Sequence, residues 1–140
     1  MPRPRVLITG VFDVLHEEHV KFLLEAKKLG TLIVGIESDQ RVRQLKGNNR
    51  PINAAPVRMQ NLLDLGIADE VLVLPKNFDR TPQHRAFLKL IQPNILAMSS
   101  HTSHLRIKSR LMQEIGGRVE IVHQHNPDVS TSKLLGLEID

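Results

Sequence analysis

The hydrophobic positions of this chain fall into two kinds of pattern that alternate along its length. Continuous apolar runs rich in β-branched residues predict five short strands, and such runs are typical of parallel strands that are covered on both faces. The strands are expected at Val6–Thr9, Thr31–Glu37, Glu70–Leu74, Ile95–Met98 and Val119–His123. This pattern predicts a sheet buried between two layers of other structure.

Between these runs, apolar residues recur at helical spacing and predict four helices. The four stripes contain Val20, Leu23 and Leu24; Met59, Leu62, Leu63 and Leu65; Leu88 and Ile91; and Leu105, Leu111, Met112 and Ile115. Glycines or a proline follow each stripe, which is typical of helix ends. The order of elements predicts an α/β fold, a Rossmann-like three-layer sandwich with a five-stranded parallel sheet, as a single domain over residues 1–140.

Composition excludes several kinds of site. The chain has 140 residues and no cysteine, which rules out disulfide frameworks, thiolate zinc sites, iron–sulfur clusters and a cysteine nucleophile. The N-terminus shows no signal-peptide stretch, and no segment approaches the roughly 18 consecutive apolar residues that a spanning helix requires. We expect a cytoplasmic protein that makes no membrane contact.

The distribution of charge is more informative than the formal net charge of +4. Five basic residues and no acidic residue occur from Arg41 to Arg58, and a second stretch without acids runs from Arg80 to Gln113. Such blocks indicate an anionic partner or, alternatively, a solvated basic face. With four Phe, no Trp and no Tyr, the chain has few platforms for stacking bases, so a nucleic-acid partner is not expected.

The loop after the first expected strand is the first candidate site, because ligands of parallel α/β sheets bind beyond the carboxyl ends of the strands. It reads Gly10-Val11-Phe12-Asp13 and continues to His16-Glu17-Glu18-His19, which is neither a dinucleotide fingerprint nor a P-loop. Two histidines in the first turn of a helix are well placed to bind phosphate, since free amides and the helix dipole point there. A two-histidine metal site and a packed histidine are the alternatives.

These residues resemble the G-[TC]-F-D-x-x-H-x-G-H motif of cytidylyltransferase-like nucleotidyltransferases. The run from Arg43 to Met59, with Lys46-Gly47 and Arg50-Pro51-Ile52-Asn53, is similar to heptose-phosphate adenylyltransferase domains. Glycerol-3-phosphate cytidylyltransferase domains are similar as well. Val129-Ser130-Thr131-Ser132 resembles the family's I-S-T-T helix start. Several matches in the right order are far more specific than any one alone.

The resemblance implies nucleotidyl transfer, in which a phosphorylated substrate attacks the α-phosphate of ATP or CTP and pyrophosphate leaves. It implies catalytic roles for His16 and His19 on the triphosphate and for Lys46 on the α-phosphate and the incoming phosphate. Nucleotide binding is implied for eight further residues: Gly10, Val11, Phe12, Asp13, Arg58, Ser130, Thr131 and Ser132. The resemblance also implies a homodimer, and Mg²⁺ that is held by the nucleotide and water rather than by a protein metal site.

Several of these residues have a structural alternative. Arg58 could pair with Asp64 or Glu37 instead of phosphate, and Ser130 to Ser132 could cap a helix. Phe12 is expected in the core rather than against a base. Arg41 and Arg43 are expected to be solvated.

Two departures from the family motif bear on activity. Glu18 stands where the family has glycine, and a carboxylate beside polyphosphate would oppose nucleotide binding. Either the side chain turns outward, for instance to Lys21, or Mg²⁺ bridges it to phosphate, and we expect the outward orientation. The loop from Ala97 to His104 lacks the glycine, acid and aromatic residue of the family pattern. Because this loop shapes the acceptor site in the family, the sequence does not identify the acceptor.

The sequence therefore predicts an adenylyl- or cytidylyltransferase that condenses an NTP, ATP in preference to CTP, with a sugar phosphate or related ester. Heptose 1-phosphate is one such acceptor. The preference for ATP depends on the run from Lys46 to Asn53. The alternative is a nucleotide-binding or regulatory domain of the same fold that has lost catalysis.

Overall fold

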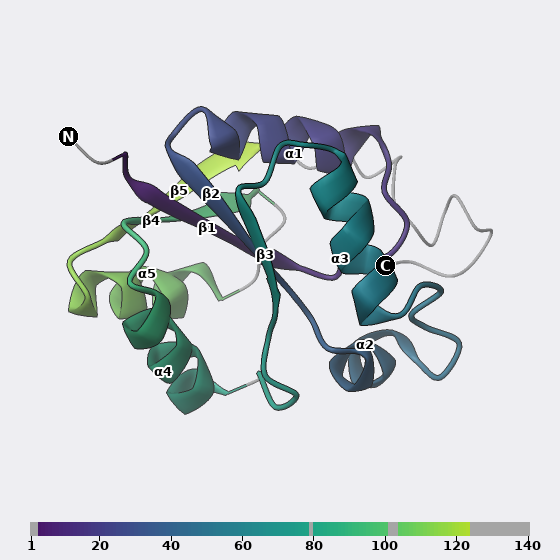
Figure 1. Cartoon of the computed structure of the whole chain (residues 1–140). Helices are drawn as coiled ribbons and strands as arrows, with labels where there is room; N and C mark the ends of the chain where they lie inside the picture. Colours follow the sequence, from purple (N-terminus) through teal and green to yellow (C-terminus); the bar gives the residue numbers. More distant parts are fainter. Residues whose placement is uncertain (1–2, 79, 101–103, 124–140) are drawn as a thin grey trace.

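A five-stranded parallel sheet forms the centre of the structure, and helices cover both of its faces (Figure 1). The computed structural model describes residues 3–78, 80–100 and 104–123. The elements in chain order are β1 (Arg5–Gly10), α1 (Glu17–Lys27), β2 (Thr31–Ile36), α2 (Asp39–Lys46), α3 (Ala55–Asp64), β3 (Glu70–Val73), α4 (Thr81–Ile91), β4 (Ile95–Ser99), α5 (Leu105–Glu114) and β5 (Arg118–His123). The predicted three-layer α/β architecture is confirmed.

The order of strands across the sheet is β3-β2-β1-β4-β5, and each neighbouring pair is parallel. β1 therefore lies in the middle, and the winding of the chain reverses between β1 and β4. Such a switch point is where ligands of open parallel sheets bind, in the crevice beyond the carboxyl ends of the strands. Here that crevice begins at Gly10 of β1 and Ser99 of β4.

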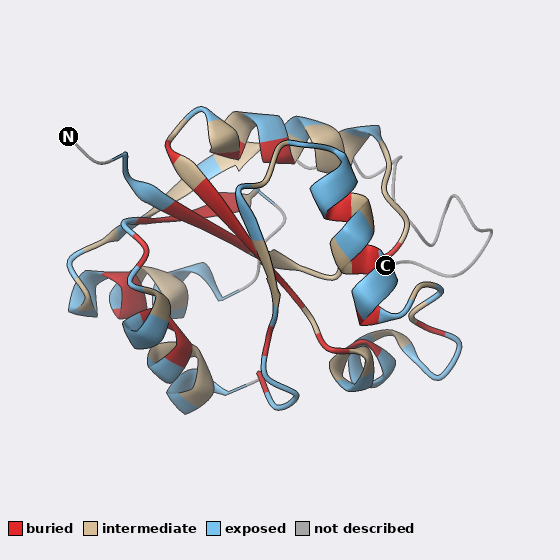
Figure 2. Ribbon diagram, viewed as in Figure 1, coloured by how far each residue is buried: buried red, intermediate tan, exposed pale blue. Residues whose placement is uncertain are grey.

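Two clusters of buried apolar side chains, one on each face of the sheet, hold the helices in place. Figure 2 shows that the central strands are mostly buried and that the helices are buried along only part of their surface. The cluster beneath α1 and α3 is centred on Val6, Ile8, Val34, Ile36, Leu23 and Leu62. The cluster beneath α4 and α5 is centred on Leu7, Ile33, Leu96, Met98, Phe87, Leu111 and Met112. Because successive residues of β1 and β2 belong to opposite clusters, both faces of the central strands are covered, which explains their continuous apolar runs.

The helix α2 is an element that the hydrophobic pattern did not predict. Val42 is its buried residue, so the segment shows no apolar stripe. Its ends are defined by polar and backbone features instead. The Ser38 hydroxyl accepts a hydrogen bond from the Arg41 amide at 3.1 Å, and Gly47 leaves the helix with φ of +100°.

Some residues of the predicted apolar stripes lie outside the core. Leu24 and Leu63 are 47% and 41% exposed, whereas their neighbours Leu23 and Leu62 are buried against the sheet. Each helix packs through one narrow side, so the pattern located the helices better than it located their buried residues. Within the described ranges, no helix is long and apolar enough to cross a membrane.

Candidate active site

The loop from Gly10 to His16 carries the chain from the carboxyl end of β1 to the first turn of α1. Phe12 adopts a φ of +50°, in the left-handed region, and its ring is buried. A Cβ on Gly10 would lie 2.8 Å from that ring, so a glycine at this position lets the ring fold back over the end of β1. Phe12 is a core residue, as expected, and its ring also contacts His19 with centroids 5.2 Å apart. The ring anchors the loop on the sheet.

His16 and His19 lie together at the N-terminus of α1. The backbone amide of His16 donates to Nδ1 of His19 at 3.3 Å, and the two rings stack with centroids 3.8 Å apart. When the His19 imidazole is neutral, this bond places its proton on Nε2. The two imidazoles thus lie at the helix start where the sequence placed them. Their contact with a triphosphate stays a prediction.

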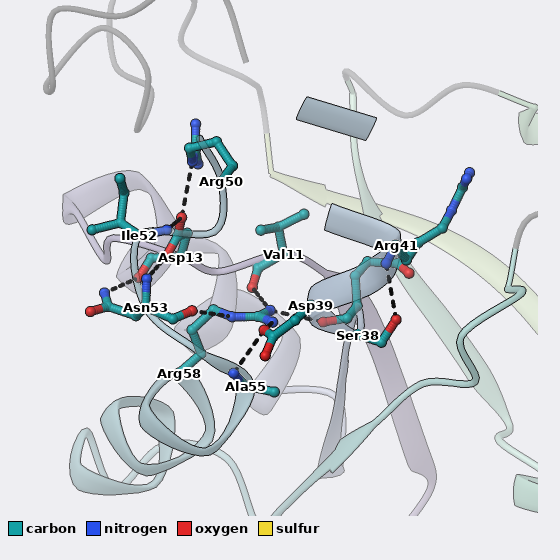
Figure 3. A network of polar contacts seen from close by, with 11 residues as sticks. Val11, Asp13, Ser38, Asp39, Arg41, Arg50, Ile52, Asn53, Ala55 and Arg58 are labelled. Atoms are coloured by element: carbon teal, nitrogen blue, oxygen red, sulfur yellow. Dashed lines mark hydrogen bonds and ion pairs between the residues drawn. The ribbon is translucent and has the colours of Figure 1, made fainter. Parts of the chain in front are cut away.

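Asp13 is the centre of a buried polar network that joins this loop to the segment after α2 (Figure 3). Its Oδ2 accepts hydrogen bonds from Arg50 Nε at 3.0 Å and the Ile52 amide at 2.7 Å, and its Oδ1 accepts one from the Asn53 amide at 2.8 Å. The Asn53 side chain donates in return to the Asp13 backbone carbonyl at 2.8 Å. Both carboxylate oxygens are thus used within the protein. The Asp13 carboxylate therefore positions the loop, and nucleotide binding by Asp13 stays a prediction.

Arg58 forms a second buried network beneath the first (Figure 3). Its side chain is fully buried on α3, and it donates to acceptors from three separate segments. These acceptors are the backbone carbonyls of Asn53, Val11 and Glu37, each at 2.9 Å, and Asp39 Oδ1 at 2.6 Å. The same Asp39 oxygen accepts the Ala55 amide at 2.9 Å. Arg58 therefore holds the loops after β1 and β2 against the start of α3.

This placement corrects the expectation that Arg58 clamps phosphate. The guanidinium has no exposed surface, and its Nε, Nη1 and Nη2 atoms all donate to protein acceptors. The alternative, in which Arg58 pairs with an acidic residue of the protein, is correct in kind but named the wrong partners. The carboxylate partner is Asp39 rather than Asp64, and Glu37 contributes its backbone carbonyl rather than its carboxylate.

Lys46 lies in the last turn of α2, half-buried, and the Asp13-bound segment begins four residues later at Arg50. Because Asp13 holds Arg50 to Asn53 against the loop after β1, the chain that follows Lys46 is tied to the loop that leads to His16. Lys46 and the two histidines thus come from segments that meet at the carboxyl edge of the sheet. The predicted catalytic roles of all three are not tested by this geometry.

Glu18 turns away from the loop and towards β5. Its carboxylate is 3.3 Å from Lys21 Nζ and 3.6 Å from His123 Nε2, and its side chain is 12% exposed. The expected pairing with Lys21 is therefore present. The contact with His123 shows that the carboxylate is directed into the protein surface between α1 and β5 rather than out into water.

Two further predictions concern the segment from Ser130 to Ser132 and a possible metal site. Ser130, Thr131 and Ser132 lie outside the described residues. Among the residues that are described, no group of three or more His, Asp and Glu side chains could hold a metal ion. The two-histidine metal alternative for His16 and His19 therefore has no third acidic or imidazole ligand within the described part of the chain.

Two titratable residues without an assigned role, Glu37 and Lys108, interact electrostatically near this edge of the sheet. Burial raises the pKa of Glu37 to about 7, although Arg41, Lys108 and Arg58 all act in the opposite direction. Burial also lowers the pKa of Lys108, and Glu37 opposes that change. The signal in the sequence was an acid at the end of the apolar run Thr31–Glu37. Arg41, expected to be solvated, is only partly exposed and contributes to this cluster.

A central parallel strand that ends in a glycine, a histidine pair at the next helix start and a switch point beside it define a Rossmann-like nucleotide-binding protein. Residues 7–136 match the family model described as cytidylyltransferase-like. The chain belongs to this family of nucleotidyltransferases.

Relatives and solved structures agree with this assignment. The chain is 34% identical over 139 residues to D-beta-D-heptose 1-phosphate adenylyltransferase of Bordetella bronchiseptica, covering 97% of this chain and 82% of that protein. It is 36% identical over 112 residues to bifunctional protein HldE of Campylobacter fetus, covering 79% of this chain but only 23% of that protein's length. The lipopolysaccharide core biosynthesis protein of Thermoplasma volcanium superposes with a TM-score of 0.69 at 25% identity, covering 88% of this chain and 96% of that one.

We predict that Asp13→Ala lowers the free energy of unfolding by roughly 3–5 kcal/mol, because it leaves the buried Arg50 guanidinium without its carboxylate. Asp64→Ala on α3, where the carboxylate is exposed and accepts a hydrogen bond from the Gln60 side chain, is the control and should change stability by about 0.5 kcal/mol or less. Urea denaturation measures both. A loss for Asp13→Ala no larger than the control's would contradict the proposed importance of the network.

A second prediction concerns pH. The folded pKa of Glu37, about 7, is above its ordinary value of 4.5, so the stability associated with its proton is present below about pH 4.5 and is lost as the pH rises through 7. Glu37→Gln does not titrate, and it should therefore gain roughly 1–3 kcal/mol relative to the unsubstituted protein between pH 5 and pH 8. Urea denaturation across this range measures the gain. Glu70→Gln, at the exposed start of β3, is the control, and its difference in unfolding free energy from the unsubstituted protein should not change with pH over this range.

Proposed function

We propose that this chain transfers a nucleotidyl group from a nucleoside triphosphate, ATP in preference to CTP, to the phosphate of a sugar phosphate or related ester. Heptose 1-phosphate is the first acceptor to test, because a relative that shares 34% identity over nearly the whole chain is named for that adenylyl transfer. The observation that carries the proposal is the histidine pair at the start of α1, held by the Asp13 network beside the segment that follows Lys46.

The reaction is an in-line displacement at the α-phosphorus. An oxygen of the acceptor phosphate forms the new bond to phosphorus, the bond from phosphorus to the α,β-bridging oxygen breaks, and pyrophosphate leaves with that electron pair. Such a transfer needs positioning and charge stabilisation rather than a covalent nucleophile. The backbone amides at the N-terminus of α1 and the imidazoles of His16 and His19 would donate to the triphosphate as charge shifts to pyrophosphate.

Lys46 would act where the acceptor phosphate approaches the α-phosphate, on the side opposite the leaving pyrophosphate. Its ammonium is a compact charge on a flexible stem, which fits two phosphates that approach each other and repel. Gly10 and Val11 would supply backbone to the nucleotide, while Phe12, Asp13 and Arg58 set the shape of the loop from below. Ser130, Thr131 and Ser132 would add hydroxyls and amides for the β- and γ-phosphates.

Mg²⁺ would enter with the nucleotide, as part of the substrate. Two acids near the loop are already engaged: both oxygens of Asp13 accept protein N–H groups, and Glu18 is paired with Lys21 and lies close to His123. The ion would neutralise phosphate charge and keep water as its remaining ligands. A homodimer is part of the proposal and follows only from the family resemblance.

The proposal predicts that His16→Ala and Lys46→Ala each raise the activation free energy by about 2–4 kcal/mol, because each removes a donor to charge that develops in the transition state. The fold should be retained, since both side chains are half-buried at the rim rather than in the core. Pyrophosphate release with ATP or CTP and a panel of phosphate esters measures turnover. Lys28→Ala, an exposed lysine paired with Glu25, is the matched control and should be unaffected. Normal turnover in a folded His16→Ala protein would refute the mechanism.

Glu18→Gly tests the departure from the family motif. Since the carboxylate is already held by Lys21 and His123, its removal should improve ATP affinity modestly and equally at low and high Mg²⁺. Titration calorimetry measures the affinity, and Glu18→Gln separates the effect of charge from that of glycine. A loss of affinity that depends on Mg²⁺ would mean that the ion bridges Glu18. An unsubstituted protein that binds no nucleotide while Glu18→Gly binds well would favour the catalytically degenerate alternative.

A further inference from the structure

A β-bulge near the end of β5 turns His123 towards α1. The residues of β4 and β5 pair one to one up to Met98 and Ile121, and the next pair is Ser99 with His123, so Val122 is an extra residue. Side chains alternate between the two faces of a sheet, and one extra residue therefore moves the next side chain to the opposite face. His123 thus lies on the face that α1 covers, whereas regular alternation would place it with Met98 on the face of α4 and α5.

Two side chains of α1 meet His123 on this face, where β5 lies next to α1 (Figure 1). The Phe22 ring stacks on the imidazole with centroids 6.0 Å apart. One helical turn earlier, the Glu18 Oε1 atom lies 3.6 Å from His123 Nε2, within the range of an ion pair, and the two side chains are 12% and 14% exposed. The Nε2 atom is buried and forms no hydrogen bond within the described residues, so the group that faces it is the Glu18 carboxylate.

Glu18 is the second residue of α1 and lies between His16 and His19. The first amides of a helix have no acceptor within the helix, and they attract a carboxylate as they attract a phosphate. A Glu18 side chain released from β5 would therefore be drawn to the same amides that the proposed function assigns to the triphosphate. The carboxylate would occupy those donors and repel the nucleotide.

Lys21 holds the other carboxylate oxygen of Glu18 less firmly than His123 holds the first. The Lys21 Nζ atom is 3.3 Å from Oε2, but the lysine side chain is 62% exposed, and exposed pairs of this kind contribute little. His123 is instead part of the sheet. The Phe22 ring packs against its imidazole, and its carbonyl accepts a hydrogen bond from the Ser100 amide at 2.9 Å. The rigid partner of Glu18 is therefore His123.

We propose that His123 is a positioning residue for nucleotide binding: it holds the Glu18 carboxylate against β5 and leaves the amides at the start of α1 to the triphosphate. The inference rests on the proposed function and adds a residue that acts through Glu18 rather than on the substrates. A chain with a carboxylate at this helix start needs a partner that keeps the charge away from phosphate. The bulge in β5 provides that partner.

The experiment is a double-mutant cycle in steady-state assays of pyrophosphate release, with D-beta-D-heptose 1-phosphate as the acceptor. His123→Phe keeps a ring against Phe22 but removes the nitrogen that faces Glu18. It should raise the KM for the nucleotide about ten-fold, as expected when an uncompensated charge approaches a polyphosphate, with kcat and the acceptor's KM nearly unchanged. In a Glu18→Gln background the same substitution should have no effect on KM, because no carboxylate is left to release.

Two further variants separate the contact from packing. His123→Gln keeps an N–H donor for Glu18 and should retain most of the nucleotide affinity of the unsubstituted protein. Lys21→Met removes the exposed partner of the same carboxylate and should raise the KM for the nucleotide less than His123→Phe does. If His123→Phe does not fold, His123→Ala is measured in the same two backgrounds with the same expectations.

The outcomes separate this inference from the proposed function. Turnover with an unchanged KM for the nucleotide in folded His123→Phe would overturn the inference alone. A raised KM that persists in the Glu18→Gln background would also overturn it, because His123 would then act by packing. If no NTP and acceptor pair releases pyrophosphate, the proposed function fails, and titration calorimetry with ATP and CTP decides the inference. Binding that His123→Phe weakens and added Glu18→Gln restores supports it, and no binding, or equal binding by all variants, overturns it.

Discussion

The buried carboxylate of Asp13 is the interaction on which the geometry of the site depends. Taking a charge out of water is costly unless several donors satisfy it, and here one guanidinium and two backbone amides do so within 3.0 Å. The loop after β1 and the segment after α2 are far apart in the sequence, and the hydrogen bonds of Asp13 join them directly. The carboxylate makes them one unit. A loop that is already ordered in this way loses less conformational entropy when a ligand binds.

Arg58 joins the loop after β2 to the same unit by donating hydrogen bonds to the Glu37 carbonyl and to Asp39. A guanidinium presents donors in a rigid planar fork, so one side chain can reach backbone carbonyls of several segments at once. Val11, Glu37 and Asn53 are fixed by their carbonyls, which leaves their side chains to be set by other contacts.

The strands and the fold class followed from the sequence because burial on both faces leaves an unmistakable apolar run, as in Thr31 to Ile36. The helix α2 did not follow, because a helix with one buried residue depends on its Ser38 cap and on Gly47 rather than on periodicity. The role of Arg58 could not follow either. A basic residue beside a phosphate-binding motif has the same appearance in sequence whether it faces phosphate or three backbone carbonyls, and only burial distinguishes the two. The contact of Glu18 with His123 could not be predicted either, because His123 is more than 100 residues away in the sequence, on strand β5.

The central position of β1 has a chemical consequence. In-line transfer requires the acceptor oxygen, the α-phosphorus and the leaving oxygen to be aligned, so the two substrates must meet at one point while their remaining parts diverge. A strand in the middle of the sheet has a covered face on each side, and only the loop at its end is in reach of both. Large side chains there would separate the reacting phosphates. Thr9 and Gly10 are small, and the one bulky residue of the turn, Phe12, is folded back into the core by its left-handed backbone. The turn thereby places the imidazoles and helix amides on the side of α1, while Glu37 and Lys108 interact on the side of α5.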